Sequence, residues 1–162
     1  MYYQSNKEFL KYQDYKTFIE FTDEYDLNYD LKNKNIPSEI YQRFAKIIFN
    51  GEPNSFFKTK QNLEFEIINQ NDPYQNHLSE IQIFLKKKPF IDKKFIVFFK
   101  NKNAFERKIY QTDTNGFAKI DSSKKGLYLI SAVHLETLNL IDQIKYGADY
   151  YSRWASLTFR KN

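Results

Sequence analysis

The sequence contains 162 residues, enough for one domain with a substantial core or for one domain with an accessory segment. It contains no cysteine, which excludes disulfides, thiolate nucleophiles and cysteine-based zinc sites. The formal net charge is +5, but the lysines are scattered among acidic residues. The densest run, Lys86-Lys87-Lys88, directly precedes Pro89 and is typical of an exposed hairpin tip. We therefore expect no nucleic-acid partner.

The first part of the chain predicts a short strand followed by a helix. Residues 7–12 are typical of a short strand. Asp14 is a suitable N-cap for a helix over about 15–25, since its side chain can accept a hydrogen bond from the first helical turn. The polar stretch of residues 26–35 predicts a loop.

The strongest helical pattern in the sequence covers residues 37–49. Pro37 suits the first turn of a helix, and Asn50-Gly51 has the chemistry of a C-cap. The apolar residues recur at spacings of i, i+4 and i+7, as on one face of a helix; they are Ile40, Tyr41, Phe44, Ile47 and Ile48. We therefore predict a two-helix lead-in segment over residues 1–58.

From residue 60 onward apolar residues alternate with polar ones, which is the period of a half-buried β-strand. The predicted strands cover residues 63–68, 81–85, 93–100, 107–113, 117–121, 127–135 and 153–159. Thr114-Asn115-Gly116 lies between two of them, and Asn-Gly is a strong signal for a β-hairpin. The sequence thus predicts a mainly β protein in which residues 59–162 form an antiparallel, immunoglobulin-like sandwich of about seven strands.

Five segments of this β-rich region, taken in order, resemble a known protein family. The segments are LEFEIINQNDPY, FLKKKPF, TDTNGFAKI, KGLYLISAVHL and DYYSRWASLTF, and SEIYQRFAKIIF resembles the helical segment that precedes the sandwich in that family. The family is an exported bacterial group of unknown function whose members are named NikM-like nickel-uptake components. The resemblance covers about residues 14–160 and implies a β-sandwich similar to transthyretin and carboxypeptidase-regulatory domains.

The resemblance also implies a cell-envelope role without enzymatic activity. A periplasmic or exported location, a transition metal such as nickel or cobalt, and membrane transport components or other envelope proteins as partners would follow from it. Family members typically begin with a signal peptide and a first β-domain that opens with a histidine, and nothing at the start of this sequence corresponds to them. The chain therefore resembles the C-terminal part of a member, and no N-terminal metal ligand carries over. No apolar stretch approaches the roughly 20 residues that cross a bilayer.

His134 is the first candidate metal ligand, because it lies at the end of the apolar run KGLYLISAVHL. Borderline metals need three or four donors, so His134 would require partners such as His77, Asp149 or Glu136. The alternative is structural, since His134 shares its strand face with apolar residues and a histidine there can bond to a backbone carbonyl. His77 lies in a polar loop, where an exposed turn histidine is the simpler interpretation.

Aromatic residues and an arginine near the C-terminus form a second candidate site. Trp154, Tyr150, Tyr151 and Arg153 would bind a sugar or a peptide by stacking if they shared one surface. Packing at the end of the core is the alternative interpretation of the same residues.

The sequence contains none of the catalytic motifs of serine hydrolases, Gly-rich phosphate loops or HExxH metalloproteases, and we expect no catalytic residues. Two classes of function stay open. One is a module for transition-metal uptake or binding, and the other is a structural module that contacts proteins or glycans without a metal. A truncated fragment of a larger family member is a third alternative.

Overall fold

The computed structural model describes residues 1–29, 36–50 and 58–162, and it confirms a mainly β protein. Gly51, the predicted C-cap, and residues 30–35 of the predicted loop lie outside these ranges. In chain order the elements are β1 (Tyr2–Gln4), β2 (Glu8–Lys11), α1 (Tyr15–Tyr25), β3 (Ser38–Ile48), β4 (Phe65–Asn69), β5 (Leu78–Leu85), β6 (Lys88–Pro89), β7 (Lys94–Lys100), β8 (Phe105–Gln111), β9 (Phe117–Asp121), β10 (Gly126–Thr137), α2 (Leu140–Tyr146) and β11 (Tyr150–Lys161). The first predicted helix and every strand predicted after residue 60 are present.

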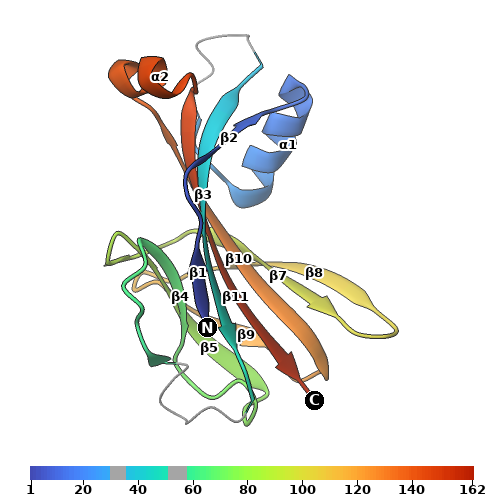
Figure 1. Cartoon of the computed structure of the whole chain (residues 1–162). Helices are drawn as coiled ribbons and strands as arrows, with labels where there is room; N and C mark the ends of the chain where they lie inside the picture. Colours follow the sequence, from blue (N-terminus) through green and yellow to red (C-terminus); the bar gives the residue numbers. More distant parts are fainter. Residues whose placement is uncertain (30–35, 51–57) are drawn as a thin grey trace.

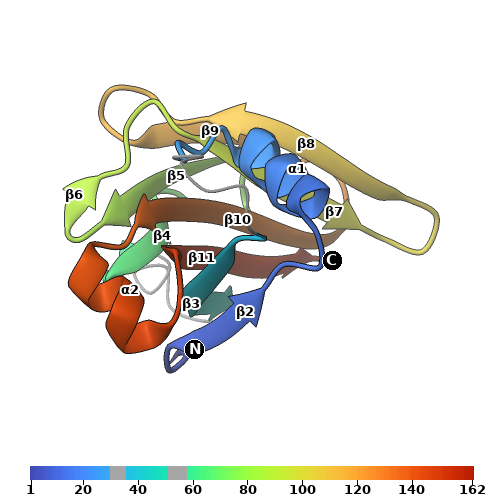
Figure 2. The ribbon, with the colours of Figure 1, turned by 90° about the horizontal axis from the view of Figure 1, so that it is seen from above.

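The strands form two sheets that pack against each other as a sandwich (Figure 1, Figure 2). The larger sheet has the order β1-β3-β11-β10-β7-β8, and β2 also pairs with β3. The smaller sheet is built on β5, which pairs with β4, β6 and β9. The predicted sandwich is therefore confirmed, with one departure: β3 and β11 run parallel, whereas the other pairs of described strands are antiparallel.

The main hydrophobic core lies between the two sheets and is built from alternate residues of their strands. Phe44, Phe65, Ile83, Ile130 and Leu157 are among its fully buried members. The long strands β3, β10 and β11 continue beyond the smaller sheet into an upper part, which carries α1, α2 and β2 (Figure 1). The same three strands thus build both the sandwich and the upper part.

Helix α1 packs on the outer face of the larger sheet, which points away from the smaller sheet. The Asp14 carboxylate accepts a hydrogen bond from the N–H of Thr17 at 2.7 Å, which confirms the predicted N-cap. Phe21 of α1 stacks on Trp154 with the ring centroids 5.3 Å apart, and Phe18 packs against Tyr150 at 5.1 Å. These aromatic contacts fix the helix across β11.

The helix predicted over residues 37–49 is wrong, because Ser38–Ile48 form β3. Alternate residues of β3 face the interior, but two of these positions hold the polar residues Gln42 and Lys46. These polar residues interrupt the alternation of apolar and polar residues that is typical of a strand. The apolar residues that remain are spaced as on one face of a helix, which explains the wrong prediction. The lead-in segment of residues 1–58 therefore contributes three strands to the larger sheet.

The hairpin predicted at Thr114-Asn115-Gly116 is wrong as a strand pairing, although a tight turn is present. The N–H of Asp113 donates to the carbonyl of Phe117 at 2.8 Å. β8 before the turn pairs with β7 in the larger sheet, whereas β9 after it pairs with β5 in the smaller sheet. Gly116 has a φ of 76°, and an added Cβ would lie 3.0 Å from the carbonyl oxygen of Ile83 on β5. The glycine thus lets the chain pass closely from one sheet to the other.

The two polar residues on the inner face of β3 have buried partners. Gln42 Nε2 donates to the carbonyl of Ser5 at 2.9 Å, and its Oε1 accepts a hydrogen bond from the Tyr151 hydroxyl at 2.7 Å. Lys46 Nζ lies 2.5 Å from Glu66 Oε1 on β4, and both side chains are buried. A buried charge without a partner is strongly destabilising, so this ion pair fixes β3 against β4.

Replacement of Glu66 with Gln is expected to destabilise the protein, because it leaves the Lys46 ammonium buried without a counter-charge. The expected loss in the free energy of unfolding is about 3–5 kcal/mol, measured by urea denaturation. Joint replacement of Lys46→Met and Glu66→Leu removes both charges and should recover most of that loss. A Glu66→Gln variant as stable as the parent would show that the pair does not hold β3.

A second ionisable group, Glu39, is buried on the opposite face of β3. Its side chain has no exposed surface, and neither carboxyl oxygen makes a hydrogen bond to a described residue. Burial raises the pKa of Glu39 to about 7, and the hydroxyl groups of Ser152 and Tyr12 lie close enough to oppose this shift in part, without good hydrogen-bond geometry. Glu39 therefore changes from neutral to charged near neutral pH.

Glu39 should make the stability of the fold depend on pH. The unfolded carboxyl ionises near 4.5 and the folded one at about 7, so the folded state loses stability as the pH rises between these values. The loss amounts to about 3 kcal/mol above this interval. Glu39→Gln should lack it, so the Tm advantage of the variant over the parent should grow from about pH 5 to about pH 8 in calorimetry. A constant difference across this range would contradict the assignment.

Candidate functional site

His134 lies on β10, on the inner face that also carries Tyr128 and Ile130, as the strand alternation predicted. Its side chain is 28% exposed, and Nε2 lies 3.6 Å from Glu136 Oε2. The ring of Phe90 meets the imidazole edge-on, with the centroids 6.2 Å apart. Burial is the largest cause that lowers the pKa of His134, so the imidazole is neutral at neutral pH. The polar group that the structure places beside Nε2 is thus the carboxylate of Glu136.

Arg153 of β11 is the centre of a charge network beside this histidine. Its side chain is only 5% exposed, and Nε donates to Glu64 Oε1 at 2.7 Å while Nη1 lies 2.8 Å from Glu136 Oε1. The guanidinium group also lies 3.9 Å from the ring centroid of Tyr151. Lys86 Nζ approaches Glu136 Oε2 to 3.5 Å. Burial acts to raise the pKa of Glu136, but Arg153 and Lys86 hold it below its usual value.

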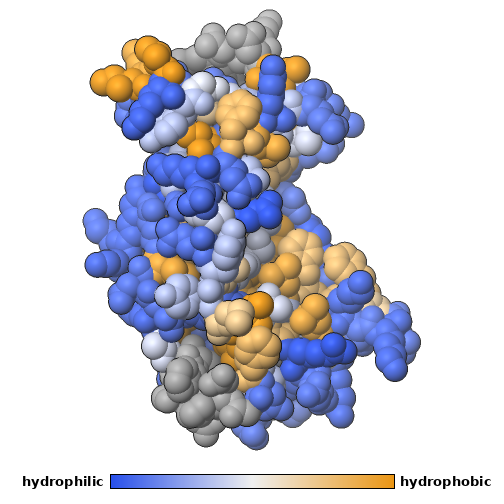
Figure 3. Space-filling view, viewed as in Figure 1, coloured by the Kyte–Doolittle hydropathy of each residue, from blue (hydrophilic) through white to orange (hydrophobic). Residues whose placement is uncertain are grey.

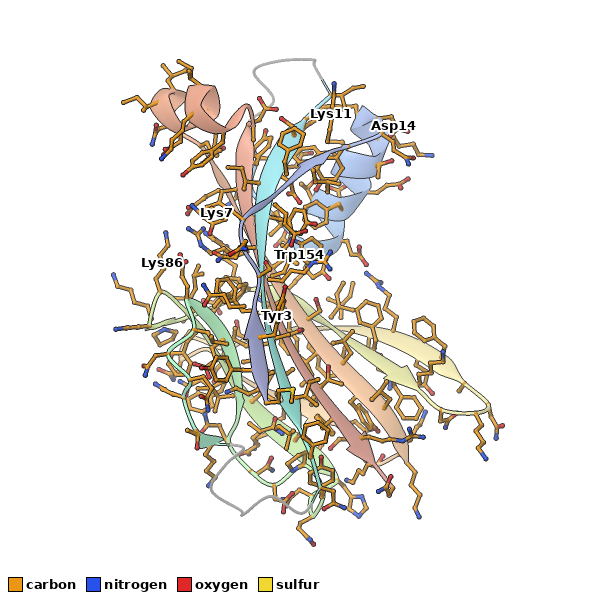
Figure 4. All side chains as sticks on the ribbon, in the orientation of Figure 1. Tyr3, Lys7, Lys11, Asp14, Lys86 and Trp154 are labelled. Carbon is orange, nitrogen blue, oxygen red and sulfur yellow. The ribbon has the colours of Figure 1, made fainter. Side chains whose placement is uncertain are left out.

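This network joins the two sheets. Glu64 directly precedes β4 and Lys86 follows β5, whereas Arg153 and Glu136 belong to the larger sheet. The backbone N–H of Lys86 donates to the carbonyl of Glu64 at 2.6 Å, so the two network residues from the smaller sheet are bonded to each other. In Figure 4, Lys86 and Trp154 mark the level at which the sandwich meets the upper part. These ion pairs therefore hold the two sheets together at that level, and we call them the charge clamp.

His77 lies far from His134. It is exposed in the loop before β5, and the adjacent carbonyl of Asn76 accepts a hydrogen bond from Lys161 at the end of β11. In the pairing of β10 with β11, His134 lies opposite Arg153. From Arg153 to Lys161 the distance along β11 is roughly 25 Å at about 3.3 Å per residue, far beyond the span of a metal site.

Asp149 is also committed elsewhere. Its Oδ2 accepts hydrogen bonds from the N–H and the hydroxyl of Ser38 at 2.9 and 3.0 Å, which ties the start of β3 to the start of β11. Within the ranges that the structure describes, no three His, Asp or Glu side chains come together as a metal site. His134 and Glu136 supply two donors, and the guanidinium of Arg153 places positive charge beside them.

The four residues of the predicted stacking patch are divided between the two faces of β11. Trp154 and Tyr150 lie on the outer face against α1. Tyr151 and Arg153 point inward, and both are buried. Packing of the core and of α1 explains these residues, which share no surface for a sugar or peptide.

The sequence pattern did not reveal the most exposed apolar group of the described chain, which lies on α2. Leu140, Ile141 and Ile144 have exposed fractions of 75%, 79% and 85%, and the helix has no buried residue. We call these three residues the α2 face. They form the orange group over α2 in the upper left of Figure 3. Exposure of this extent is unusual for three neighbouring aliphatic side chains.

α2 is a capped, preformed helix despite its lack of buried residues. At its start, Asn139 Oδ1 accepts a hydrogen bond from the N–H of Asp142. At its end, Gly147 adopts a left-handed conformation, and its N–H donates a hydrogen bond to the carbonyl of Gln143. Asn139 and Gly147 are the sequence signal that could have predicted it. Neither α2 nor the other described helix is long and apolar enough to cross a membrane.

An open cleft of about 540 Å³ lies at the other end of the long strands. Lys100, Lys102, Lys125 and Arg160 line it together with Leu127. None of the four cations forms an ion pair with a described residue. They come from strand ends and turns that are distant in the sequence, so their proximity follows only from the pairing of β7, β10 and β11.

Comparison with known proteins places the chain in a family. No curated protein and no solved structure matches it. The family described as Domain of unknown function (DUF4198) matches residues 2–136, from β1 to the end of β10. This match covers strands of both sheets and well over half of the chain. The chain therefore belongs to the DUF4198 family of unknown function.

Proposed function

We propose that this protein is a non-enzymatic module of the cell envelope that binds a partner protein through the α2 face. The observation that carries the proposal is the exposure of Leu140, Ile141 and Ile144 on a helix without a buried residue. Gathered aliphatic side chains on an exposed surface are typical of interaction sites. The resemblance to exported NikM-like proteins supports the envelope location and suggests membrane transport components among the partners.

The α2 face has the form of a helix that inserts into an apolar groove. Residues at i and i+4 share one side of a helix, so Leu140 and Ile144 project together with Ile141 beside them. The caps at Asn139 and Gly147 preform the helix, so a partner does not have to order it on binding. Full burial of each aliphatic side chain contributes roughly 1.5–3 kcal/mol.

The charges around α2 favour a protein groove over a lipid surface. The helix carries one acid and one base, Asp142 and Lys145, and Asp149 follows it, so no basic excess attracts anionic headgroups. Lys7 and Lys145 lie over the Tyr146 ring at 5.3 and 4.9 Å from its centroid. An apolar centre with a rim of mixed charge is the usual composition of a contact between proteins.

A photo-crosslinking residue at position 141 should trap a discrete partner in cells of the source organism, and one at the exposed Lys87 should not trap it. The isolated partner should bind Ile141→Ser/Ile144→Ser more weakly than the parent. Because each lost contact contributes more than about 1.4 kcal/mol, calorimetry should show a loss of at least roughly tenfold for each substitution.

Leu78→Ser is the matched control, because Leu78 is an exposed aliphatic residue away from α2. It should keep the parent affinity, and circular dichroism should show the same fold for all variants. Equal affinity of the parent and the Ile141→Ser/Ile144→Ser variant would overturn the proposal. Self-association of the parent through α2, detected by light scattering, would replace the partner by a second copy and would also overturn it.

Transition-metal binding is the second candidate function, and the His134–Glu136 pair is the observation that favours it. A neutral imidazole and a carboxylate lie 3.6 Å apart at a partly exposed edge of the sandwich. Nickel or cobalt at this edge would complete its coordination with water or with donors of a partner. Arg153 and Lys86 oppose such binding by their charge.

This second candidate predicts that nickel or cobalt titrated into the protein releases heat that His134→Ala removes. His77→Ala should keep the heat, because His77 lies at the far end of β11. Equal heats for the parent and His134→Ala would overturn the metal candidate without affecting the proposal for α2.

A further inference from the structure

The outer face of the larger sheet ends in a row that mixes apolar and basic side chains. Strand register places Lys100 beside both Phe105 and Leu127, and Leu127 beside Arg160. Paired residues of antiparallel strands point to the same face, so these four side chains cross the sheet in one line. Phe105 is 67% exposed and Leu127 is 40% exposed.

Two turns add further cations beside this row. Lys102 lies in the β7–β8 turn, which Asn101 closes by accepting two backbone N–H groups at 2.8 Å. Lys125 precedes Gly126, where an added Cβ would lie 2.5 Å from the ring of Phe99. Both turns are therefore fixed by local structure, and they hold the two lysines at the open cleft.

The cations at this end differ from the neighbouring lysines in their partners. Lys124 pairs with Glu106 at 2.5 Å, and Lys161 donates to two backbone carbonyls of the smaller-sheet side. Lys100, Lys102 and the other cations of the cleft have no acidic partner among the described residues. Cations that lie together without counter-charges create a positive potential that attracts an anionic ligand.

Apolar side chains continue from the row across the same face. Phe98 stacks on Phe105 with the centroids 6.2 Å apart, and Ile109 is 50% exposed. Figure 3 shows this apolar band over β7, β8 and β10, with hydrophilic side chains beside it. Apolar and aromatic side chains next to lysine and arginine match the lipid interface better than they match a free phosphate, which offers nothing to an apolar group.

We propose that this end of the larger sheet binds the surface of a membrane that contains anionic lipid. The basic–apolar face consists of Lys100, Lys102, Phe105, Lys125, Leu127 and Arg160. Its cations contact the phosphate headgroups, and its two apolar side chains enter the interface between headgroups and acyl chains. The face and α2 lie at opposite ends of the long strands (Figure 1), so the inference does not depend on the partner of α2.

The test is sedimentation of the protein with phosphatidylcholine vesicles, with and without phosphatidylglycerol. The parent should bind only the anionic vesicles, and salt should weaken the binding by screening. Lys102→Gln/Lys125→Gln should bind about 30-fold more weakly, since each cation near an anionic surface contributes a factor of about five. Phe105→Ser should also bind more weakly, while the salt dependence stays the same.

Lys87→Gln/Lys88→Gln is the matched control, because it removes the same charge from two exposed positions, one in the β5–β6 turn and one at the start of β6. It should bind like the parent, and circular dichroism should show that both double variants are folded. Equal losses in the two double variants would overturn the proposal, as would failure of the parent to bind anionic vesicles. Binding of inorganic phosphate or of an oligonucleotide at this face without vesicle binding would also overturn it.

Discussion

The parallel pairing of β3 with β11 is the constraint on which the rest of the structure depends. It runs from Glu39 beside Tyr150 to Ile48 beside Phe159, and the hydrogen bond from Ser38 to Asp149 at its start joins residues 111 positions apart. The whole smaller sheet and three strands of the larger one lie between them in the sequence. The pairing therefore closes a very long loop of the chain, and such non-local contacts favour slow folding.

Buried polar groups set the register of this pairing. A slip of one residue would turn Gln42 and Lys46 to the outer face, away from Tyr151 and Glu66. The same polar groups explain why the sequence pattern predicted a helix here, since their partners come from other strands and are invisible locally. By contrast, the strands after residue 60 carry mainly apolar residues at the positions that face the core between the sheets, and alternation alone located them.

The candidate sites show a similar division between local and non-local information. Alternation along β11 could have separated Trp154 from Arg153, because neighbouring residues of a strand face opposite ways. The distance of His77 from His134 depends on which strands pair, which the local sequence does not show. Asn115-Gly116 predicted a reversal of the chain, but it could not predict that the strand after the turn joins the other sheet. The cations of the cleft belong to the same class, since register alone brings Lys100 and Arg160 to Leu127.

β10 and β11 are paired over their full length, from Gly126 beside Lys161 to Thr137 beside Tyr150. Each has 12 residues, so the pair of strands is roughly 40 Å long at about 3.3 Å per residue. The basic–apolar face lies at one end of this pair and α2 at the other, and the charge clamp around Arg153 and helix α1 stabilise the strands between them. A partner on α2 would thus be held at a set height above a surface under the opposite end. Insertion of two residues in each strand would raise that height by roughly 7 Å and keep every side chain on its original face.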